Sequence, residues 1–584
     1  MIILGLDFGT SNTCISYFLN NKNHIVINEY GEYTTPSCIF FSKDDDEILY
    51  GKTAMECKRS GCLISNIKRL LGLTYSDYIQ NTNVQHFFKH LNIERDNVSE
   101  YCSILLIHNN VPKKISVSKI IEIYLKWLLE SAKSSIDNLS NDIIITVPVH
   151  FNIHQREIMK QCLENIGYNV LRIINEPTSA TLSYIYSSKS NNIENILVLD
   201  CGGGTTDCTI LEADYDNLFF EVLETRGDPF LGGDDITNNL VTYIIKNTQN
   251  YNFSLKNIEN IRNKCQVCKY NLSFKNNDKI IIDHNDNIKV FNISKTTFEN
   301  INKSWFKSLE NIIKQVSCNY KIDRIILVGG TTRIPYIKNI LHNIFGLNII
   351  IDNSLNPDHT VSIGAGIQGF MLTRENDEND ITFVDTISMS LGIETIGGIM
   401  SPIISKNTII PSSKTETFIA TDDDCININI YQGEKRFVKD NLFLNSIKIN
   451  TKKNDIVKIT FDITSDGTLH IITRNQTNKQ NNEISLHNYK KKIQDEYVYE
   501  DHCDKLSDLD LSNLIMAKIE LNNTFKLLQK ISEENNKTIT NNPEYNKLLN
   551  DTNYVLENYK TYTVDYLKTY KKTFEETWHK LHFT

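Results

Sequence analysis

The chain has little that would place it in a membrane or on nucleic acid. No apolar run approaches the roughly 20 residues that a membrane-spanning helix needs. The formal net charge is −10 at pH 7, which argues against the basic face of a nucleic-acid-binding protein. The chain meets Asp7 before an apolar signal-peptide core could form. We therefore expect a cytoplasmic protein without a nucleic-acid or membrane partner.

The sequence also lacks a cysteine framework. Its 13 cysteines are scattered and odd in number, which favours reduced thiols over a disulfide scaffold. Cys265 and Cys268 form a CxxC pair, but they lie in a segment with helical periodicity and no second ligand pair accompanies them. A structural zinc ion would need four ligands. We therefore interpret the pair as ordinary helical cysteines rather than as a metal or redox centre.

Hydrophobic periodicity changes twice along the chain. Up to about residue 372, apolar runs of strand type alternate with amphipathic helical stretches, which indicates α/β architecture. A polar, acidic break at 374–380 follows, and the period then becomes two, with Ile426, Ile428 and Ile430 alternating with asparagines. The last stretch has one proline and helical spacing. The predicted divisions are an α/β domain at 1–375, a linker at 376–387, a compact β domain at 388–486 and helices at 487–584.

Within the β domain, one hairpin can be predicted from its turn. Apolar strand patterns at 456–463 and 469–472 flank Ser465, Asp466 and Gly467. Asp-Gly is a strong signal for a tight turn between two antiparallel strands.

Two segments of the α/β domain resemble each other. ILGLDFGTSN at 3–12 and LVLDCGGGTTD at 197–207 each predict a strand that ends in an aspartate, a glycine turn and a second strand. Glycines let backbone N–H groups approach phosphate oxygens, and carboxylates can hold a hydrated Mg²⁺. One such turn could be an ordinary hairpin, whereas two matching copies suggest a duplicated nucleotide clamp. A third segment, IILVGGTTRIP at 325–335, would let the backbone lie close to an adenine or ribose.

Two other glycine patterns are misleading. Gly51, Lys52 and Thr53 end like a P-loop, but Asp46 stands where that loop needs its first glycine. The segment 364–369 fits GxGxxG, yet no apolar strand leads into it. We interpret its small residues as a surface for close helix packing.

The three nucleotide-type segments together resemble the actin-like ATPase superfold of sugar kinases, actins and heat-shock chaperones. Further motifs are similar to the 70-kDa heat-shock family and occur in that family's order: TTPS at 34–37, KRLLG at 68–72, ITVP at 145–148, LRIINEPT at 171–178, LGGDD at 231–235 and SLGIETIGG at 390–398. The resemblance implies an α/β actin-like ATPase domain of two duplicated lobes, a β-sandwich substrate-binding domain and an α-helical lid. It implies slow, peptide-stimulated ATP hydrolysis by a chaperone of stress response and protein folding.

The resemblance also implies roles for individual residues. Lys68 would contact the γ-phosphate and the attacking water, and Thr205 would touch the γ-phosphate. Mg²⁺ would be held, mostly through water, by Asp7, Asp200, Glu176 and Asp207. ATP or ADP would be contacted by Gly9, Thr10, Ser11, Asn12, Gly202, Gly203, Gly204, Thr205, Gly232, Gly233, Gln266, Lys269, Tyr270, Ser273, Gly329, Gly330, Thr331, Arg333 and Asp358.

The adenosine pocket departs from the family pattern. Gln266 stands in place of a glutamate and Tyr270 in place of an arginine that stacks on adenine. Asn12 replaces a tyrosine and Thr206 a phenylalanine. These changes leave open the nucleotide affinity and the potassium dependence that the family would imply.

Coupling in the family runs through the apolar linker, here DITFVD at 380–385 with Asp385, and through a proline–arginine relay, here Pro148 and Arg156. Apolar peptide segments would bind a pocket lined by Ile393, Thr395, Ile396, Ile399, Phe418 and Ile426. Taken singly, Ile393 and Phe418 are better interpreted as sandwich core.

The implied partners are unfolded polypeptides, a J-domain co-chaperone and a nucleotide exchange factor. Asn152, Arg172, Asn175 and Thr178 match the J-domain surface, whereas His150 and Ile153 replace a tyrosine and an aspartate. An alternative is a nucleotide-binding assembly factor or co-chaperone with weak or no ATPase activity. A sugar kinase is a remote third, because the chain appends a β domain instead of a sugar site.

Overall fold

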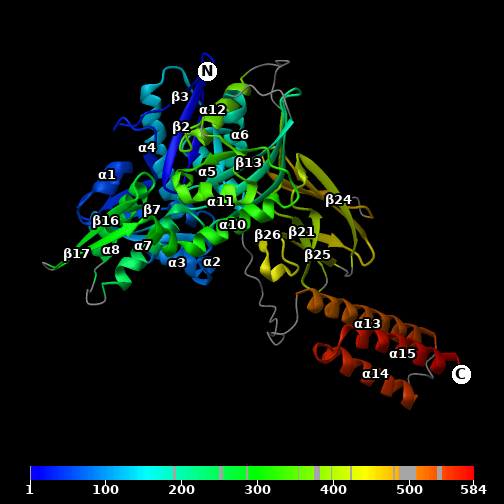
Figure 1. Cartoon of the computed structure of the whole chain (residues 1–584). Coiled ribbons are helices and arrows are strands. Elements are labelled where there is room, and N and C mark those ends of the chain that lie inside the picture. Colours follow the sequence, from blue (N-terminus) through cyan, green and yellow to red (C-terminus); the bar gives the residue numbers. More distant parts are fainter. Residues whose placement is uncertain are drawn as a thin grey trace.

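The structure is a computed structural model. It describes residues 2–187, 193–248, 253, 255–284, 287–352, 354–373, 382–395, 397–420, 424–477, 481–485, 508–535 and 542–583. Figure 1 shows a large α/β part, a β part beside it, and three C-terminal helices that extend away from both. Among the described helices, none combines the length and the apolarity that crossing a membrane requires.

Two sheets in the α/β part have the same topology. In each sheet, two central strands form an antiparallel hairpin. The strands beyond the first strand of that hairpin run parallel to it. The first sheet has the order β12-β11-β1-β2-β3, formed by Asn169–Asn175, Leu139–Val147, Ile2–Phe8, Asn12–Leu19 and Lys22–Ile25. The second begins β19-β18-β13-β14-β15, formed by Ile350–Asp352, Arg324–Val328, Ile193–Cys201, Thr206–Asp214 and Phe219–Asp228. The predicted pair of strand-turn-strand units is confirmed as two equivalent hairpins, β1–β2 and β13–β14.

We call residues 2–175 lobe I and residues 193–352 lobe II. The other elements of lobe I are β4 (Thr35–Pro36), β5 (Cys38–Ser42), β6 (Ile48–Tyr50), α1 (Gly51–Glu56), β7 (Gly61–Ser65), the 3₁₀ helix η1 (Ile67–Leu70), α2 (Tyr75–Gln80), α3 (Thr82–Phe88), β8 (Asn92–Arg95), β9 (Cys102–His108), β10 (Val111–Ser116), α4 (Val117–Ser135) and α5 (Ile153–Glu164). Those of lobe II are α7 (Gly233–Lys246), α8 (Leu255–Leu272), β16 (Asn277–His284), β17 (Asn287–Ser294), α9 (Lys295–Ile301), α10 (Lys303–Ser317), η2 (Gly330–Arg333) and α11 (Pro335–Phe345). Cys265 and Cys268 lie in α8 and are buried in the lobe II core, as unpaired thiols.

Two helices join the lobes. Helix α6 (Glu176–Ser187) packs on the second sheet, α12 (Thr360–Met371) packs on the first, and the two helices cross. A Cβ at Gly364 would overlap the carbonyl group of Ser179, and a Cβ at Gly5 would overlap the backbone at Gly366. The GxGxxG segment is therefore a surface for close helix packing, as the sequence predicted.

The β domain consists of two four-stranded sheets around one apolar core. Their orders are β22-β21-β25-β26, formed by Ile399–Ile404, Leu391–Thr395, Asp424–Gln432 and Leu442–Thr451, and β24-β27-β28-β29, formed by Ser412–Ile419, Ile456–Ile463, Leu469–Asn475 and Asn481–Ser485. A short 3₁₀ helix, η3 (Val438–Asp440), precedes β26. The predicted Asp-Gly hairpin is β27–β28, and Gly467 in its turn has φ +80°.

The C-terminal helices are α13 (Asp508–Asn535), α14 (Pro543–Glu557) and α15 (Val564–Phe583), with η5 (Tyr559–Thr561) between the last two. They share an apolar core of their own that includes Leu521, Phe574 and Trp578. This confirms the predicted helical end.

Part of the predicted linker is a strand. Residues 374–381 lie outside the described part, and β20 (Thr382–Thr386) follows. β20 pairs in parallel with β15 and antiparallel with β23 (Ile409–Ile410). The lobe II sheet therefore continues through the linker into the β domain.

Candidate nucleotide site and its link to the β domain

The two Asp-Gly turns lie against each other at the ends of β1 and β13. A Cβ at Gly203 would overlap the Ser11 hydroxyl, and a Cβ at Gly204 would lie 2.7 Å from Thr10 Oγ1. The side chains of Thr10 and Ser11 thus occupy the space that glycine leaves open in the opposite turn. Glycine permits this approach, because any side chain at 203 or 204 would require Ser11 or Thr10 to move.

Buried acidic groups surround one lysine beside these turns. Lys68 Nζ lies 2.8 Å from Glu176 Oε1, and both side chains are buried. Burial raises the pKa of Asp7 to about 7, with a further increase from Glu176. Burial also raises the pKa of Asp200, and Glu176, Asp207 and Asp7 act in the same direction. Several carboxyl groups thus share a site with the positive charge of Lys68, so a bound cation would be stabilised there.

The acidic residues do not form a ready-made metal cage. In the described part of the chain, no three histidine, cysteine or acidic side chains converge closely enough to bind a metal directly. Mg²⁺ usually keeps several of its waters and takes only one or two carboxylates. The acidic side chains beside Lys68 are ligands of the type that a hydrated Mg²⁺ takes, and their role in holding the metal stays a prediction.

Asp207 has a neighbour whose contact the sequence did not predict. His150 Nδ1 lies 3.3 Å from Asp207 Oδ1, and a Cβ at Gly227 would overlap that same oxygen. In the sequence, His150 is marked only by its departure from a family pattern. Its proximity to the acidic group depends on how β14 faces the loop after β11, which local sequence does not show.

The predicted adenosine residues are only partly together. Lys269 and Ser273 line a small pocket with Phe298 and Tyr336. Burial lowers the pKa of Lys269 to about 8, and its Nζ donates to the carbonyl of Gly233 at 2.7 Å. Another hollow, lined by Tyr30, Tyr33 and Trp127 among others, lies elsewhere on lobe I and contains none of the predicted site residues.

Two of the altered residues take other positions. Thr237 Oγ1 donates to Gln266 Oε1 at 2.8 Å, so Gln266 bridges α7 and α8 within lobe II. Tyr270 is 64% exposed and packs against Phe274. Neither side chain lines the pocket of Lys269 and Ser273. Asn12 is also exposed.

The third glycine segment packs behind the Asp200 turn. Gly329 has φ +78°, and a Cβ there would overlap the carbonyl of Cys201 and lie 2.9 Å from Asp200 Oδ1. Thr331 Oγ1 donates to the carbonyl of Gly202 at 2.8 Å. Nearby, Arg333 pairs with Asp358 at 2.6 Å, and a Cβ at Gly330 would lie 2.9 Å from the other Asp358 oxygen.

The family model described as Hsp70 protein matches residues 3–582. The chain belongs to the Hsp70 family. It is 32% identical over 520 residues to Heat shock cognate 70 kDa protein 3 of Dictyostelium discoideum, covering 84% of this chain and 81% of the relative. It is 31% identical to Heat shock 70 kDa protein 2 of Paracoccidioides lutzii, over 85% of this chain and 78% of the relative, and 31% identical to Heat shock 70 kDa protein of Emericella nidulans, over 85% and 79%. It is thus a divergent Hsp70, an ATP-dependent molecular chaperone.

In this Hsp70, Asp385 of β20 is anchored on lobe I and α6. Its carboxylate accepts hydrogen bonds from Asn175 Nδ2 at 2.8 Å and Thr178 Oγ1 at 3.0 Å. Arg156 donates to the other end of the Asn175 amide at 2.5 Å. Burial raises the pKa of Asp385, and attraction to Arg156 opposes that rise. Pro148 lies in the loop before α5, the helix that carries Arg156, and its carbonyl accepts a hydrogen bond from Phe151 N–H at 3.0 Å.

A second contact holds the β domain against lobe I. Ile153, the first residue of α5, is 6% exposed and belongs to the apolar core of the β domain. Its backbone N–H donates to Gln432 Oε1 at 3.2 Å. The neighbouring His154 is also buried, which lowers its pKa to about 4. The β domain also contacts lobe II, because Asn407 Nδ2 of the β domain donates to Glu224 Oε2 of lobe II at 2.9 Å.

The predicted peptide-binding residues divide into core and rim. Ile393 is fully in the sandwich core, and Phe418 and Ile426 pack partly buried against it. Thr395 Oγ1 donates to the carbonyl of Ile399 at 2.9 Å across the β21–β22 hairpin. Ile396 lies outside the described residues. The first turns of helix α13 approach the turn of this hairpin, since a Cβ at Gly397 would be 2.7 Å from Ile515 Cγ2.

Proposed function

We propose that this Hsp70 captures extended apolar segments of unfolded proteins in its β domain and couples their capture and release to ATP binding and slow hydrolysis. The proposal is supported mainly by the position of strand β20. This one strand extends the lobe II sheet, anchors Asp385 beside Asn175 and Thr178, and pairs with β23 of the β domain. A change in the angle between the lobes would therefore act directly on the β domain.

The proposed layout is an actin-like ATPase domain at 1–375, a linker at 376–387, a β-sandwich substrate-binding domain at 388–486 and a helical lid at 487–584. The matching topology of the two lobe sheets supports the first assignment. The separate apolar cores of the β domain and of the last three helices support the others.

ATP with Mg²⁺ would bind between the two glycine turns and supply the phosphoryl group that water attacks. Backbone N–H groups of both turns would hold phosphate oxygens, and Asp7 and Asp200 would hold waters of the metal. Lys68, fixed by Glu176, would orient the attacking water and neutralise charge that develops on the phosphate. Potassium remains a further proposed ion.

We expect Mg²⁺·ADP binding to release more protons at about pH 6 than at about pH 9. The raised pKa of Asp7 leaves its carboxyl group protonated below about pH 7, and the hydrated metal favours the carboxylate, so the proton must leave on binding. Calorimetry in buffers with different ionisation enthalpies measures this proton count. Equal proton release at both pH values would contradict the prediction.

In the β domain, main-chain hydrogen bonds and an apolar pocket near Ile399, Phe418 and Ile426 would hold the peptide. All three side chains are partly buried, and Phe418 and Ile426 pack against the sandwich core. Burying one substrate leucine would contribute roughly 1.5–3 kcal/mol, which suits reversible capture. Helix α13, whose first turns approach the β21–β22 turn at Gly397, would act as the lid.

J-domain co-chaperones, nucleotide exchange factors and a cytoplasmic location are part of the proposal. The J-domain surface predicted from Arg172, Asn175 and Thr178 lies where the anchored Asp385 is bound. Binding of a J-domain at this surface would therefore depend on whether Asp385 of β20 is bound there.

The proposal is tested by Mg²⁺-dependent ATP hydrolysis with and without an unfolded apolar peptide. We expect slow hydrolysis that accelerates when peptide is added, and weaker peptide binding when ATP is present. Hydrolysis that is indifferent to peptide would remove the coupling. ATP binding without hydrolysis would favour an assembly factor.

A further inference from the structure

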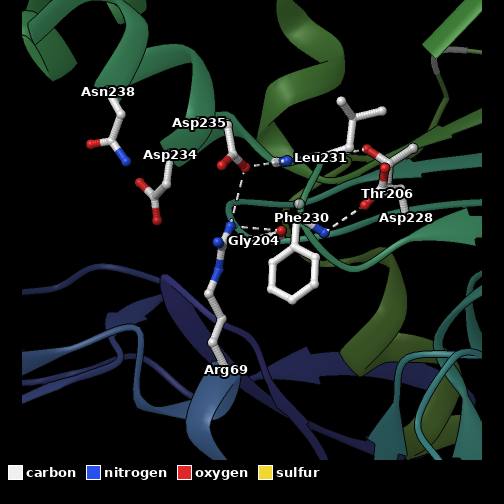
Figure 2. A network of polar contacts seen from close by, with 12 residues as sticks. Arg69, Gly204, Thr206, Asp228, Phe230, Leu231, Asp234, Asp235 and Asn238 are labelled. Atoms are coloured by element: carbon white, nitrogen blue, oxygen red, sulfur yellow. Dashed lines mark hydrogen bonds and ion pairs between the residues drawn. The ribbon is translucent and has the colours of Figure 1, made fainter. Parts of the chain in front are cut away.

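Arg69, the residue after the proposed catalytic lysine, crosses from lobe I to lobe II. It lies in η1, and its side chain is 3% exposed. Its NH2 donates to the carbonyl of Gly204 at 2.7 Å and lies 3.2 Å from Asp235 Oδ2 (Figure 2). The guanidinium also stacks on Phe87 of lobe I, 3.8 Å from the ring centroid. A lobe I cation thus holds the backbone of the second glycine turn.

Phe230 makes a second contact between the lobes, in the opposite direction to that of Arg69. It belongs to lobe II, in the loop between β15 and α7, yet its ring packs against the apolar core of lobe I. Figure 2 shows the ring pointing toward the lobe I ribbon that carries Arg69. The loop is fixed by Phe230 N–H donating to Asp228 Oδ1 at 2.8 Å and by Thr206 Oγ1 donating to the Leu231 carbonyl.

Both crossings end on the elements that would hold phosphate. Arg69 contacts Gly204 in one turn, and Asp235 accepts from the N–H of Gly232 at 2.7 Å at the start of α7. Phe230 stands two residues before Gly232 in the same loop. Separating the lobes would therefore break the Arg69 contacts and expose the Phe230 ring in one movement.

We propose that Arg69 and Phe230 form an inter-lobe latch that keeps the nucleotide cleft closed and sets the rate of nucleotide release. The proposal rests on the nucleotide site proposed above. It assigns positioning roles, since neither side chain is needed to touch the reacting phosphate.

The chemistry of the latch makes it reversible. Nε and NH1 of Arg69 are buried and have no hydrogen-bond partner among the described residues. Buried, unpaired donors of a charged group are unfavourable, and water would reach them once the lobes separate. This offsets part of the stabilisation from the Phe230 ring and the Arg69–Asp235 pair. The latch therefore stabilises the closed cleft but still allows it to open.

The test compares Phe230→Ala, Arg69→Lys and Asp235→Asn with the unaltered chain. Leu347→Ala is the matched control, because Leu347 is 83% exposed in lobe II and lies outside the cleft. Dissociation of a fluorescently labelled ADP is followed by stopped flow. We expect Phe230→Ala to release ADP about tenfold faster, which corresponds to ~1.4 kcal/mol. Its single-turnover hydrolysis of bound ATP should change less than about twofold.

Amide hydrogen exchange in the nucleotide-free protein provides a readout that does not need ligand. Exchange at 202–205 and 232–236 should accelerate in the three latch variants and stay unchanged in Leu347→Ala. Phe230→Leu, which keeps an apolar side chain, should restore slow exchange if Phe230→Ala proves unstable.

Unchanged ADP release and unchanged exchange in folded latch variants would overturn the latch. If the unaltered chain does not bind labelled ADP, the nucleotide site fails, and the exchange result still decides whether the lobes are latched.

Discussion

Replacing Lys68 by alanine is expected to slow single-turnover ATP hydrolysis by about 10²–10³-fold while ATP still binds. Lys68 is buried and in contact with Glu176, beside carboxyl groups whose pKa values are raised by burial and by one another. Without the ammonium group, charge that develops on the phosphate would face an acidic site with one cation fewer. Glycine-turn N–H groups would still hold the nucleotide.

The matched control is Lys52→Ala, because Lys52 is a partly exposed lobe I lysine whose ion pair with Glu32 lies away from the glycine turns. Quenched-flow measurement of phosphate release gives the rate, and calorimetry gives ATP affinity. Hydrolysis at the unaltered rate in Lys68→Ala would remove this lysine from the chemistry.

The second large effect is expected from Ile153→Asp. Ile153 projects from lobe I into the apolar core of the β domain, so an aspartate there would bury an unpaired carboxylate. Such burial costs about 3–5 kcal/mol, more than a hundredfold in a docking equilibrium. The β domain can escape this cost by separating from lobe I. We therefore expect peptide to lose its effect on ATP hydrolysis while basal hydrolysis persists.

Small-angle scattering should show a larger radius of gyration for Ile153→Asp with ATP than for the unaltered chain. Ile153→Val is the control, because loss of one methyl group costs only about 0.5–1.5 kcal/mol. A compact Ile153→Asp variant that still responds to peptide would contradict the docking role of this residue.

Local patterns predicted much of the fold. Strand periodicity followed by Asp and Gly was sufficient for the β1–β2 and β13–β14 hairpins, and Asp-Gly alone marked the β27–β28 turn. The helical assignment of 364–369 was also correct, since no strand leads into it. These features depend on residues close in sequence, where pattern and structure are directly linked.

Contacts between segments that are distant in the sequence could not be predicted from local patterns. Ile153 begins an ordinary amphipathic helix, and its partner Gln432 is 279 residues away. Arg69 follows a recognised lysine, but its crossing to Gly204 depends on the relative placement of two lobes. The linker pattern likewise showed an apolar segment but not its pairing with β15.

Residues assigned to the site by motif position alone depend on where their side chains turn. Motif order predicts Gln266 and Tyr270 beside adenosine; in the structure Gln266 accepts a hydrogen bond from Thr237 and Tyr270 is exposed. A motif fixes where the backbone runs, whereas a substituted side chain can turn toward another partner. The roles of the peptide-binding residues stay predictions for the same reason.

A crystal structure of the protein with Mg²⁺ and a non-hydrolysable ATP analogue would show whether both glycine turns hold the nucleotide. We predict that the triphosphate lies between the two glycine turns, with backbone N–H groups of both turns on its oxygens and the metal bridged by water to Asp7 and Asp200. A triphosphate that contacts one turn alone, or lies elsewhere on the molecule, would contradict this prediction.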